Sequence, residues 1–289
     1  YGETYEGRSL FIAIITHPEN KFSVDEIRTN HLISSGLEEG TAPEKDYALV
    51  WLSYSVHGNE SSSTEAAMET LFSFANTSNK KTMDWLRRTI VIIDPCINPD
   101  GRDRYVQFYT MTGTHPPDAD VSTREHQEPW PGGRTNHYYF DLNRDWTWQT
   151  QVETVQRMQL YNSWMPHIHV DYHEQYFNEP YYFAPAAKPY HLQITSWQRE
   201  FQKIIGKNHS RYFDNNNWLY FTKEHFDLLY PGYGDTYPIY NGAIGMTYEK
   251  AGGAAGGVSA ITSDGDTLTL RSRIKHHHTT GLSTVESAY

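Results

Sequence analysis

The chain has 289 residues, of which 38% are hydrophobic, and a formal net charge of -11. This length and composition supply a substantial buried core and exclude a disordered chain, and we expect one domain over residues 1–289. The sequence pI near 5.7 argues against nucleic acid or an anionic membrane as a partner, because either would require a basic face.

Apolar runs and helical patterns alternate along the chain. The apolar runs predict strands at residues 10–16, 47–56, 89–97, 167–172 and 243–248. Helical patterns are expected at residues 61–75, 145–164 and 190–205, with a further helix near the end of the chain. This order predicts the α/β class, with a mixed, mostly parallel central sheet and helices on both faces.

Three other features limit the class of protein. No run of 18 apolar residues occurs, so we expect no membrane span. The chain opens with Tyr1 rather than with a signal sequence, and we expect a mature, secreted or periplasmic protein that acts as a monomer. The run His276-His-His278 is interpreted as a solvated face or a chance cluster rather than a metal site.

The first chemically informative motif follows the strand at 47–56. In an α/β sheet, ligands bind beyond the carboxyl ends of the strands, and this strand leads into His57-Gly-Asn-Glu60. A histidine and a glutamate three residues apart can bind one zinc ion, although a polar loop that caps the next helix is the alternative. The third ligand is expected to be His173, which ends a later strand. His169, deeper on the same face, is the alternative.

Two more motifs complete an ordered set. Asn98-Pro-Asp-Gly-Arg102 follows one apolar run, and Asp141-Leu-Asn-Arg144 precedes a helical pattern. Residues 98–146, rich in Pro, Gly and Asp, predict a long functional connection, and N-P-D-G alone is typical of a turn. With H-G-N-E, the order and spacing of these motifs resemble the zinc carboxypeptidase family, which includes the pancreatic and regulatory carboxypeptidases. The resemblance covers most of the chain, from Tyr5-Glu-Gly-Arg-Ser-Leu10 onwards.

The resemblance implies one zinc ion per chain, held by His57, Glu60 and His173. It also implies that Glu249, which follows the strand at 243–248, is the general base that deprotonates a water together with zinc. A glutamate that merely ends a strand in solvent is the alternative at this position.

On the substrate side, the resemblance assigns Asn143 and Arg144 to the terminal carboxylate of a peptide. Asp141 would orient one of the zinc histidines. Arg134, which lies in a G-R-T-N sequence, would polarise the scissile carbonyl, with Arg102 as the alternative.

The remaining assignments concern the loop before Glu249. The resemblance implies that a tyrosine folds over the bound substrate, and Tyr230 is our choice, with Tyr233 in reserve. Asp235 lies at a spacing that resembles the specificity loop of the family. The residue that sets the pocket floor in the pancreatic enzymes corresponds to Gly234, which offers neither an acidic nor an apolar floor.

Together these assignments predict a zinc-dependent exopeptidase. It would hydrolyse the C-terminal peptide bond of peptides or proteins through a metal-activated water. The alternative enzyme is a zinc amidohydrolase of the deacylase type that acts on N-acyl amino acids. A binding module that keeps the fold without catalysis is the non-enzymatic alternative.

Overall fold

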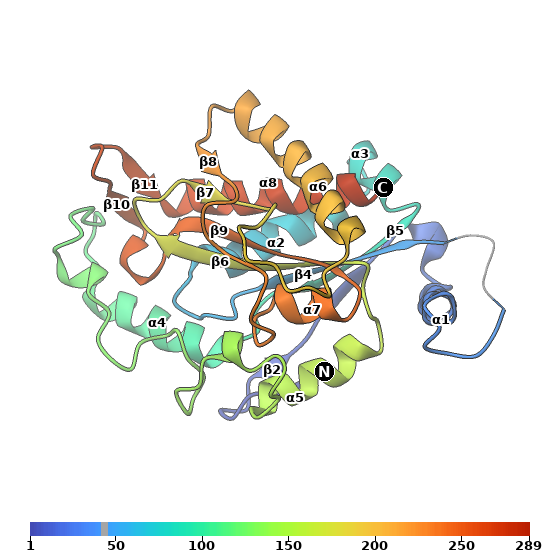
Figure 1. Ribbon diagram of the computed structural model, residues 1–289. Coiled ribbons are helices and arrows are strands. Elements are labelled where there is room, and N and C mark those ends of the chain that lie inside the picture. Colours follow the sequence, from blue (N-terminus) through green and yellow to red (C-terminus); the bar gives the residue numbers. More distant parts are fainter. Residues whose placement is uncertain (42–45) are drawn as a thin grey trace.

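The computed structural model describes residues 1–41 and 46–289 and places a seven-stranded sheet at the centre of this part of the chain (Figure 1). In sheet order the strands are β3 (Ala13–Ile15), β5 (Thr89–Asp94), β4 (Ala48–Tyr54), β6 (Ile168–Tyr176), β9 (Ile244–Gly252), β7 (Tyr181–Tyr182) and β8 (Tyr220–Phe221).

The sheet is mixed and mostly parallel, as the sequence predicted. β5, β4, β6 and β9 run parallel to one another, whereas β3 pairs with β5 and β7 pairs with β9 in the antiparallel sense. Two small antiparallel pairs lie outside this sheet: β1 (Gly2–Glu3) with β2 (Ser9–Leu10), and β10 (Ser259–Ile261) with β11 (Thr267–Thr269).

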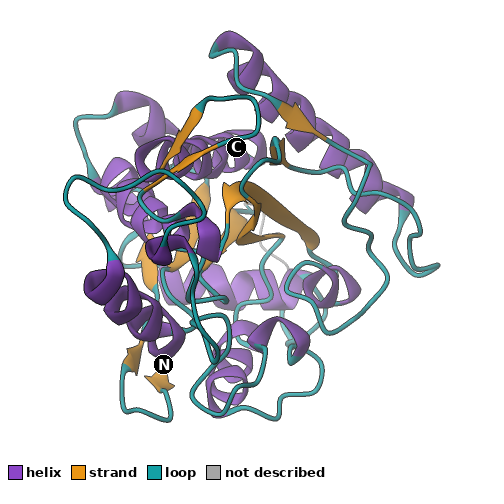
Figure 2. Cartoon of the chain, turned by 90° about the vertical axis from the view of Figure 1, so that its left-hand side faces the viewer, coloured by secondary structure: helices purple, strands orange, loops and turns teal. Residues whose placement is uncertain are grey.

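Helices cover both faces of the sheet (Figures 1 and 2). One face carries α2 (Ser62–Ala75), α3 (Lys80–Trp85), α6 (Ser196–Asn215) and α8 (Leu270–Ala288). The other carries α1 (Val24–Ser34) and α5 (Val152–Asn162). The helix α4 (Pro99–Thr112) begins directly after Asn98, and α7 (Thr236–Tyr240) begins two residues after Gly234.

The central strands are buried on both sides, which explains their uninterrupted apolar runs. In β4, Val50 and Leu52 pack into the cluster with α2 and α8, whereas Leu49 and Trp51 pack with α1 and α5, and all four are fully buried. Successive side chains of a strand point to opposite faces, so each face of β4 contributes to a separate core. Full burial of such a side chain stabilises the fold by about 1.5–3 kcal/mol.

Three expectations about helices require correction. Residues 99–112, expected to lie in an irregular connection, form α4, because Asn98 accepts a hydrogen bond from the amide of Gly101 and Pro99 occupies the first turn. The helix expected at 145–164 begins only at Val152. The helix expected at 190–205 begins at Ser196, after a capping box made by Thr195 and Gln198.

The histidine run near the end of the chain is not a solvated face. His277 of α8 is fully buried, and its Nδ1 lies 2.8 Å from the hydroxyl of Tyr181. Burial lowers the pKa of His277 to about 3, so this histidine is a neutral core residue. Among the described helices, none combines the length and the apolar character that a membrane crossing requires.

Candidate active site

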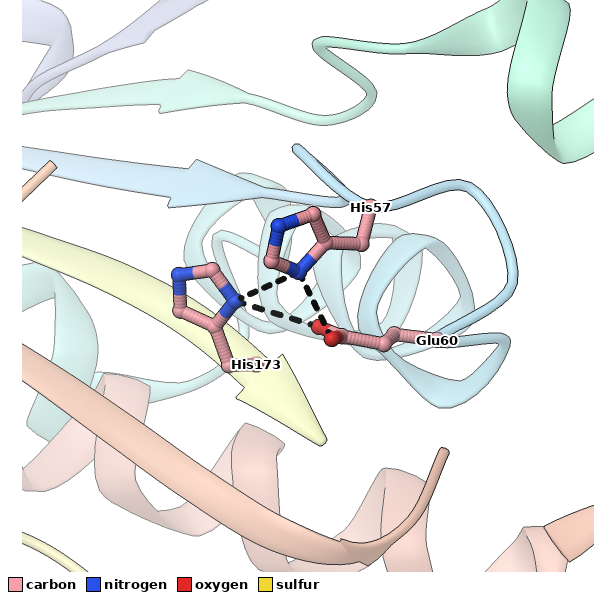
Figure 3. Close-up of side chains that lie close together, drawn as sticks. All are labelled: His57, Glu60 and His173. Atoms are coloured by element: carbon pink, nitrogen blue, oxygen red, sulfur yellow. Dashed lines mark hydrogen bonds and ion pairs between the residues drawn. The ribbon is translucent and has the colours of Figure 1, made fainter. Parts of the chain in front are cut away.

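Two histidines and a glutamate converge at the carboxyl ends of β4 and β6 (Figure 3). His57 and Glu60 lie on the turn between β4 and α2, and His173 lies in β6. Nδ1 of His57 is 2.7 Å from Glu60 Oε1 and 3.2 Å from Nδ1 of His173, and the latter is also 3.2 Å from Glu60 Oε2. All three residues are buried, and within the described residues they form the one group suited to a metal ion.

The Nε2 atom of each of the two histidines lies within hydrogen-bond distance of a carboxylate. Nε2 of His57 lies 3.0 Å from Asp141 Oδ1, and Nε2 of His173 lies 2.9 Å from Asp171 Oδ2. A carboxylate accepts the Nε2 proton and thereby leaves Nδ1 with its lone pair. Nη1 of Arg134, 3.3 Å from Nδ1 of His57, is a donor that fits this tautomer.

This donor set fits a zinc ion. Two imidazole lone pairs and a carboxylate that face one another within hydrogen-bond distance require positive charge between them, which either a proton or a metal ion can supply. Two nitrogens and one oxygen are the protein ligands of a common type of catalytic zinc site, which leaves a position open. His169, the alternative ligand, is fully buried between the rings of Trp146 and Tyr161 and lies outside the group.

The charged residues of the metal group shift one another's pKa values. Burial alone would raise the pKa of Glu60, but His57 and His173 outweigh it and hold the pKa well below its usual range. Burial opposes the charge of His173, but Asp171 and Glu60 raise its pKa well above the usual value. These shifts indicate a site that binds positive charge.

Arg134 lies beside the metal group, whereas the alternative Arg102 does not. The Arg134 guanidinium is 3.0 Å from Asp141 Oδ2 and 3.8 Å from Glu60 Oε1, and it lines the central cavity. Arg102 pairs instead with Glu65 of α2, outside that cavity. The structure therefore brings the expected arginine, and not its alternative, next to the metal group.

Asn143 and Arg144 also line the cavity. The side-chain oxygen of Asn143 accepts a hydrogen bond of 2.8 Å from the amide of Gly234, and its nitrogen lies 3.3 Å from Nε2 of His173. Arg144 lies over the ring of Tyr233, with the guanidinium carbon 4.5 Å from the ring centroid. Its side chain is 46% exposed, so its guanidinium can reach a ligand.

Glu249 faces the metal group from the next strand. It pairs with His173 in the parallel register of β6 and β9, which places both side chains on the same side of the sheet. Glu249 is only 8% exposed, so the alternative of a solvent-facing strand end is wrong. Burial, the largest cause, together with Glu60 and Asp171, raises the pKa of its carboxyl to about 8.

The two candidate tyrosines differ in position. Tyr233 lines the cavity, whereas Tyr230 does not and its hydroxyl instead accepts a hydrogen bond of 3.0 Å from the indole of Trp148. The rings of the two tyrosines are in edge-to-face contact, with their centroids 4.9 Å apart. The reserve choice, Tyr233, is therefore the one that the structure places at the site.

Three glycines, one of them in the first turn of α4, allow close contact between the segments that surround this site. A Cβ on Gly58 would lie 2.7 Å from the carbonyl oxygen of Gly133, and one on Gly101 would lie 2.3 Å from the same oxygen. Real Cβ atoms do not approach backbone this closely. The absence of side chains at these positions thus allows the loop that carries Arg134 to reach the metal group.

Sequence reasoning missed the role of two buried carboxylates. Asp171 lies two residues before His173 on the same strand face, which was a usable signal. Glu174 accepts hydrogen bonds from the backbone amide and hydroxyl of Ser62 and forms a fully buried ion pair of 2.9 Å with Arg273 of α8. Arg273 is too distant in the sequence to be found by spacing.

These side chains surround one cavity of about 360 Å³. It is lined by His57, Glu60, Arg134, Asn143, Arg144, Asp171, His173, Glu174, Gln175, Phe226, Asp227, Tyr233, Asp235, Thr247 and Glu249. Burial raises the pKa of Asp235 to about 6, with a further contribution from Asp171. The cavity thus combines a metal group, buried carboxyls of raised pKa that include Asp235 and Glu249, and two guanidinium groups.

A model of the zinc carboxypeptidase family matches residues 1–220. No curated protein matches the chain in sequence. The metallo-carboxypeptidase from Burkholderia cenocepacia has a similar structure, with a TM-score of 0.66 and 14% identity over 99% of this chain and 63% of its own. This chain therefore spans less than two thirds of that protein.

Two further solved structures share the fold. The metallo-carboxypeptidase from Pseudomonas aeruginosa, in complex with (2-guanidinoethylmercapto)succinic acid, gives a TM-score of 0.64 at 11% identity over 100% of this chain and 64% of its own. Carboxypeptidase A from Helicoverpa armigera gives 0.59 at 14% identity, over 99% of this chain and 67% of its own. At these identities the likeness concerns the fold.

Proposed function

This chain belongs to the zinc carboxypeptidase family, whose members are zinc metallohydrolases, and from that premise we propose that it removes the C-terminal residue of peptides or proteins. The observation that carries the proposal is Arg144. Its guanidinium lies in the same cavity as the metal group and Glu249. A guanidinium binds a carboxylate through two parallel hydrogen bonds, and a free terminal carboxylate is what distinguishes the last peptide bond from internal ones.

The metal group would hold one zinc ion through Nδ1 of His57, a carboxylate oxygen of Glu60 and Nδ1 of His173. Zinc, when bound in such a site, supplies a Lewis acid that polarises a carbonyl and lowers the pKa of water. Asp141 and Asp171 hold the two imidazoles in the tautomer that this requires.

The other residues of the site would bind the substrate, transfer the proton and stabilise the developing negative charge. Asn143 and Arg144 bind the terminal carboxylate and so fix the position of the last peptide bond. Glu249 accepts a proton from the attacking water and passes it to the leaving amine. Arg134 donates hydrogen bonds to the oxygen of the scissile carbonyl as negative charge develops there.

The test is a thermodynamic cycle, analogous to a double-mutant cycle, that combines a change of Arg144 with a change of the substrate's C-terminus. Free-acid and C-terminally amidated forms of one peptide are assayed with parental and Arg144→Ala enzyme. Stranding one member of a buried charged pair costs about 2–5 kcal/mol, and the exposure of Arg144 places the effect at the lower end. Amidation and Arg144→Ala should each lower kcat/KM strongly, yet amidation should matter far less once Arg144 is gone, because both changes break one contact.

The matched control is Arg102→Ala, which removes an arginine that lies outside the cavity. It should leave the effect of amidation unchanged. Additive losses in the Arg144 cycle would mean that this residue does not bind the carboxylate. A parallel assay on N-acyl amino acids separates a peptidase from a deacylase. A secreted or periplasmic location and a monomeric state stay predictions from the sequence.

A further inference from the structure

Glu128 connects two segments of the active site through its two carboxylate oxygens. Its Oε2 accepts a hydrogen bond of 2.7 Å from the side-chain amide of Asn59. Its Oε1 accepts a hydrogen bond of 2.5 Å from the backbone amide of Gly133. Asn59 lies on the turn at residues 57–60 (the metal turn), which carries two of the three metal ligands, and Gly133 immediately precedes Arg134. One side chain therefore joins the metal turn to the loop that carries the arginine assigned to the scissile carbonyl.

The contact between Glu128 and Gly133 closes a short loop. Gly132 has a φ of +62°, a left-handed conformation that glycine adopts at little cost. A Cβ at this position would lie 3.2 Å from Glu128 Oε2. The chain can therefore fold back onto the carboxylate, and the position of the loop depends on the position of that carboxylate.

Three side chains hold the backbone around Arg134. Arg104 of α4 donates a hydrogen bond of 2.6 Å to the carbonyl oxygen of Gly132. Asn98, the residue before α4, donates one of 3.1 Å to the carbonyl oxygen of Arg134 itself. Glu128 is the third, and of these three side chains it is the one that also forms a hydrogen bond with the metal turn. It therefore sets the distance between that turn and the arginine.

The position of the Arg134 guanidinium depends on this backbone. The side chain is 44% exposed, so packing alone does not fix it. Its guanidinium lies 3.0 Å from Asp141 and 3.8 Å from Glu60, which are attached to other segments. Donors that stabilise an oxyanion act through a geometry that is set before the reaction, and a small displacement reduces their effect.

We propose that Glu128 is a positioning residue, which holds Arg134 at the place where it meets the oxygen of the scissile carbonyl. Glu128 does not belong to the lining of the central cavity, so it acts through Asn59 and Gly133 and not on the substrate. This inference rests on the proposed carboxypeptidase function. Because Arg134 acts as negative charge develops on the carbonyl oxygen, the contribution of Glu128 belongs to kcat and not to KM.

Steady-state kinetics give the first measurement. Glu128→Ala should lower kcat by about tenfold, less than the roughly 100-fold to 1000-fold loss that follows removal of an oxyanion donor itself. KM for a free-acid peptide should stay near the parental value, because Asn143 and Arg144, assigned to the terminal carboxylate, are unchanged. Kinetic constants are compared at equal zinc content. A parental kcat in Glu128→Ala, or a loss that occurs in KM alone, would overturn the proposal.

The matched control is Gln127→Ala, at the neighbouring residue. Gln127 is exposed, and its side chain donates a hydrogen bond of 2.8 Å to the carbonyl oxygen of Val121 rather than to the active site. This variant should keep the parental kcat. An equal loss in Gln127→Ala and Glu128→Ala would show that any truncation in this loop slows the enzyme, which contradicts a specific role of Glu128.

A double-mutant cycle with Arg134 separates positioning from a general structural role. If Glu128 acts through Arg134, then Glu128→Ala should have little further effect on kcat once Arg134→Ala is present, because both changes remove one contribution. Loss of loop structure that acts by another route would instead reduce kcat equally in the two backgrounds. Additive losses therefore count against the proposal.

An exchanged pair tests the contact with the metal turn. Asn59→Asp places a second carboxylate against Glu128 and should lower kcat. Addition of Glu128→Gln restores a donor opposite an acceptor at unchanged net charge, and its remaining oxygen still accepts from Gly133. The double variant should therefore recover most of the parental kcat. A double variant no faster than Asn59→Asp alone would show that this hydrogen bond does not position the site.

Binding of a tetrahedral anion distinguishes this inference from the proposed function, because it requires no turnover. Phenylphosphonic acid offers oxygens to zinc and to Arg134 together. In isothermal titration of zinc-loaded protein, Glu128→Ala should bind it about tenfold more weakly than the parent, and the difference should vanish when Arg134→Ala is present. If the parent cleaves no peptide and this difference holds, the proposed function is wrong and the positioning role stands. Equal affinities in a parent that does cleave peptides would give the opposite result.

Discussion

The carboxylate of Asp141 lies 3.0 Å from Nε2 of His57 through one oxygen, and its other oxygen is 3.0 Å from Arg134. One side chain thus links a metal ligand to the arginine assigned to the scissile carbonyl. Burial would raise the pKa of Asp141, but His57, Arg134 and Arg144 hold it well below the usual range.

Asp141→Asn should therefore weaken zinc binding. An amide cannot match a carboxylate as acceptor for the imidazole proton, and changes of this kind cost about 10–100-fold in metal affinity. Chelator competition measures the affinity. Asp118→Asn, at an exposed aspartate, is the control. Equal zinc affinity in Asp141→Asn and the parent would show that Asp141 does not hold His57.

His57→Ala and His173→Ala should each lose zinc, because the remaining two ligands cannot complete a tetrahedral site. His169→Ala should keep it, since His169 lies outside the metal group. Elemental analysis after dialysis gives the metal content. The ligand assignment fails if His169→Ala is the variant without metal.

Glu249→Gln should fold, retain zinc and lose about 100-fold or more in kcat, the usual scale for a general base. The comparison is made at equal zinc content. Near-parental turnover would exclude Glu249 as the base. Glu174, the other glutamate beside the ligands, is an unsuitable substitute because it is paired with Arg273.

The metal-free protein should lose stability through Glu249 as the pH rises. Its folded-state pKa of about 8 lies above the ordinary value of 4.5. The neutral carboxyl therefore favours the folded state, and this contribution is complete below about pH 4.5 and is lost as the pH rises through about pH 8. Urea unfolding of chelator-treated protein should show that the free energy of unfolding of Glu249→Gln increases relative to that of the parent between about pH 5 and pH 8. Parallel pH profiles of the two proteins would contradict this.

The buried pair of Glu174 and Arg273 should be essential for stability. Both side chains are fully buried, and Arg273→Met leaves the Glu174 carboxylate without its cation. Removal of one partner from such a pair costs about 3–5 kcal/mol, measured by urea unfolding. Arg211→Met, which removes the exposed partner of Glu286, is the control and should cost less than about 1 kcal/mol. Similar losses in the two variants would mean that burial of the pair does not matter.

The central strands and the metal group could be predicted from the sequence because both follow local rules. β4, β5, β6 and β9 are buried on both faces, and their apolar runs are therefore continuous. His57 and Glu60 come from one turn, and His173 comes from the end of a strand predicted to lie in the same sheet.

The other features depend on tertiary contacts. α4 was missed because N-P-D-G is compatible with a turn and with the start of a helix, and because Val106 and Met111 of this helix are exposed rather than in periodic contact with a core. The partnership of Glu174 with Arg273 requires α8 to lie across the sheet, which no local pattern specifies. The preference for Tyr233 over Tyr230 depends on the path of one loop.

The contact among Gly58, Gly101 and Gly133 has a consequence for engineering this protein. The three glycines are far apart in the sequence, Gly101 in the first turn of α4 and the other two in loops, yet backbone atoms of this group occupy the side-chain space of each of them. In a library that randomises one of these segments at a time, most substitutions of its glycine would introduce a side chain that clashes with the backbone of the other segments. Variation of this region therefore requires the two loops and the first turn of α4 to be redesigned together.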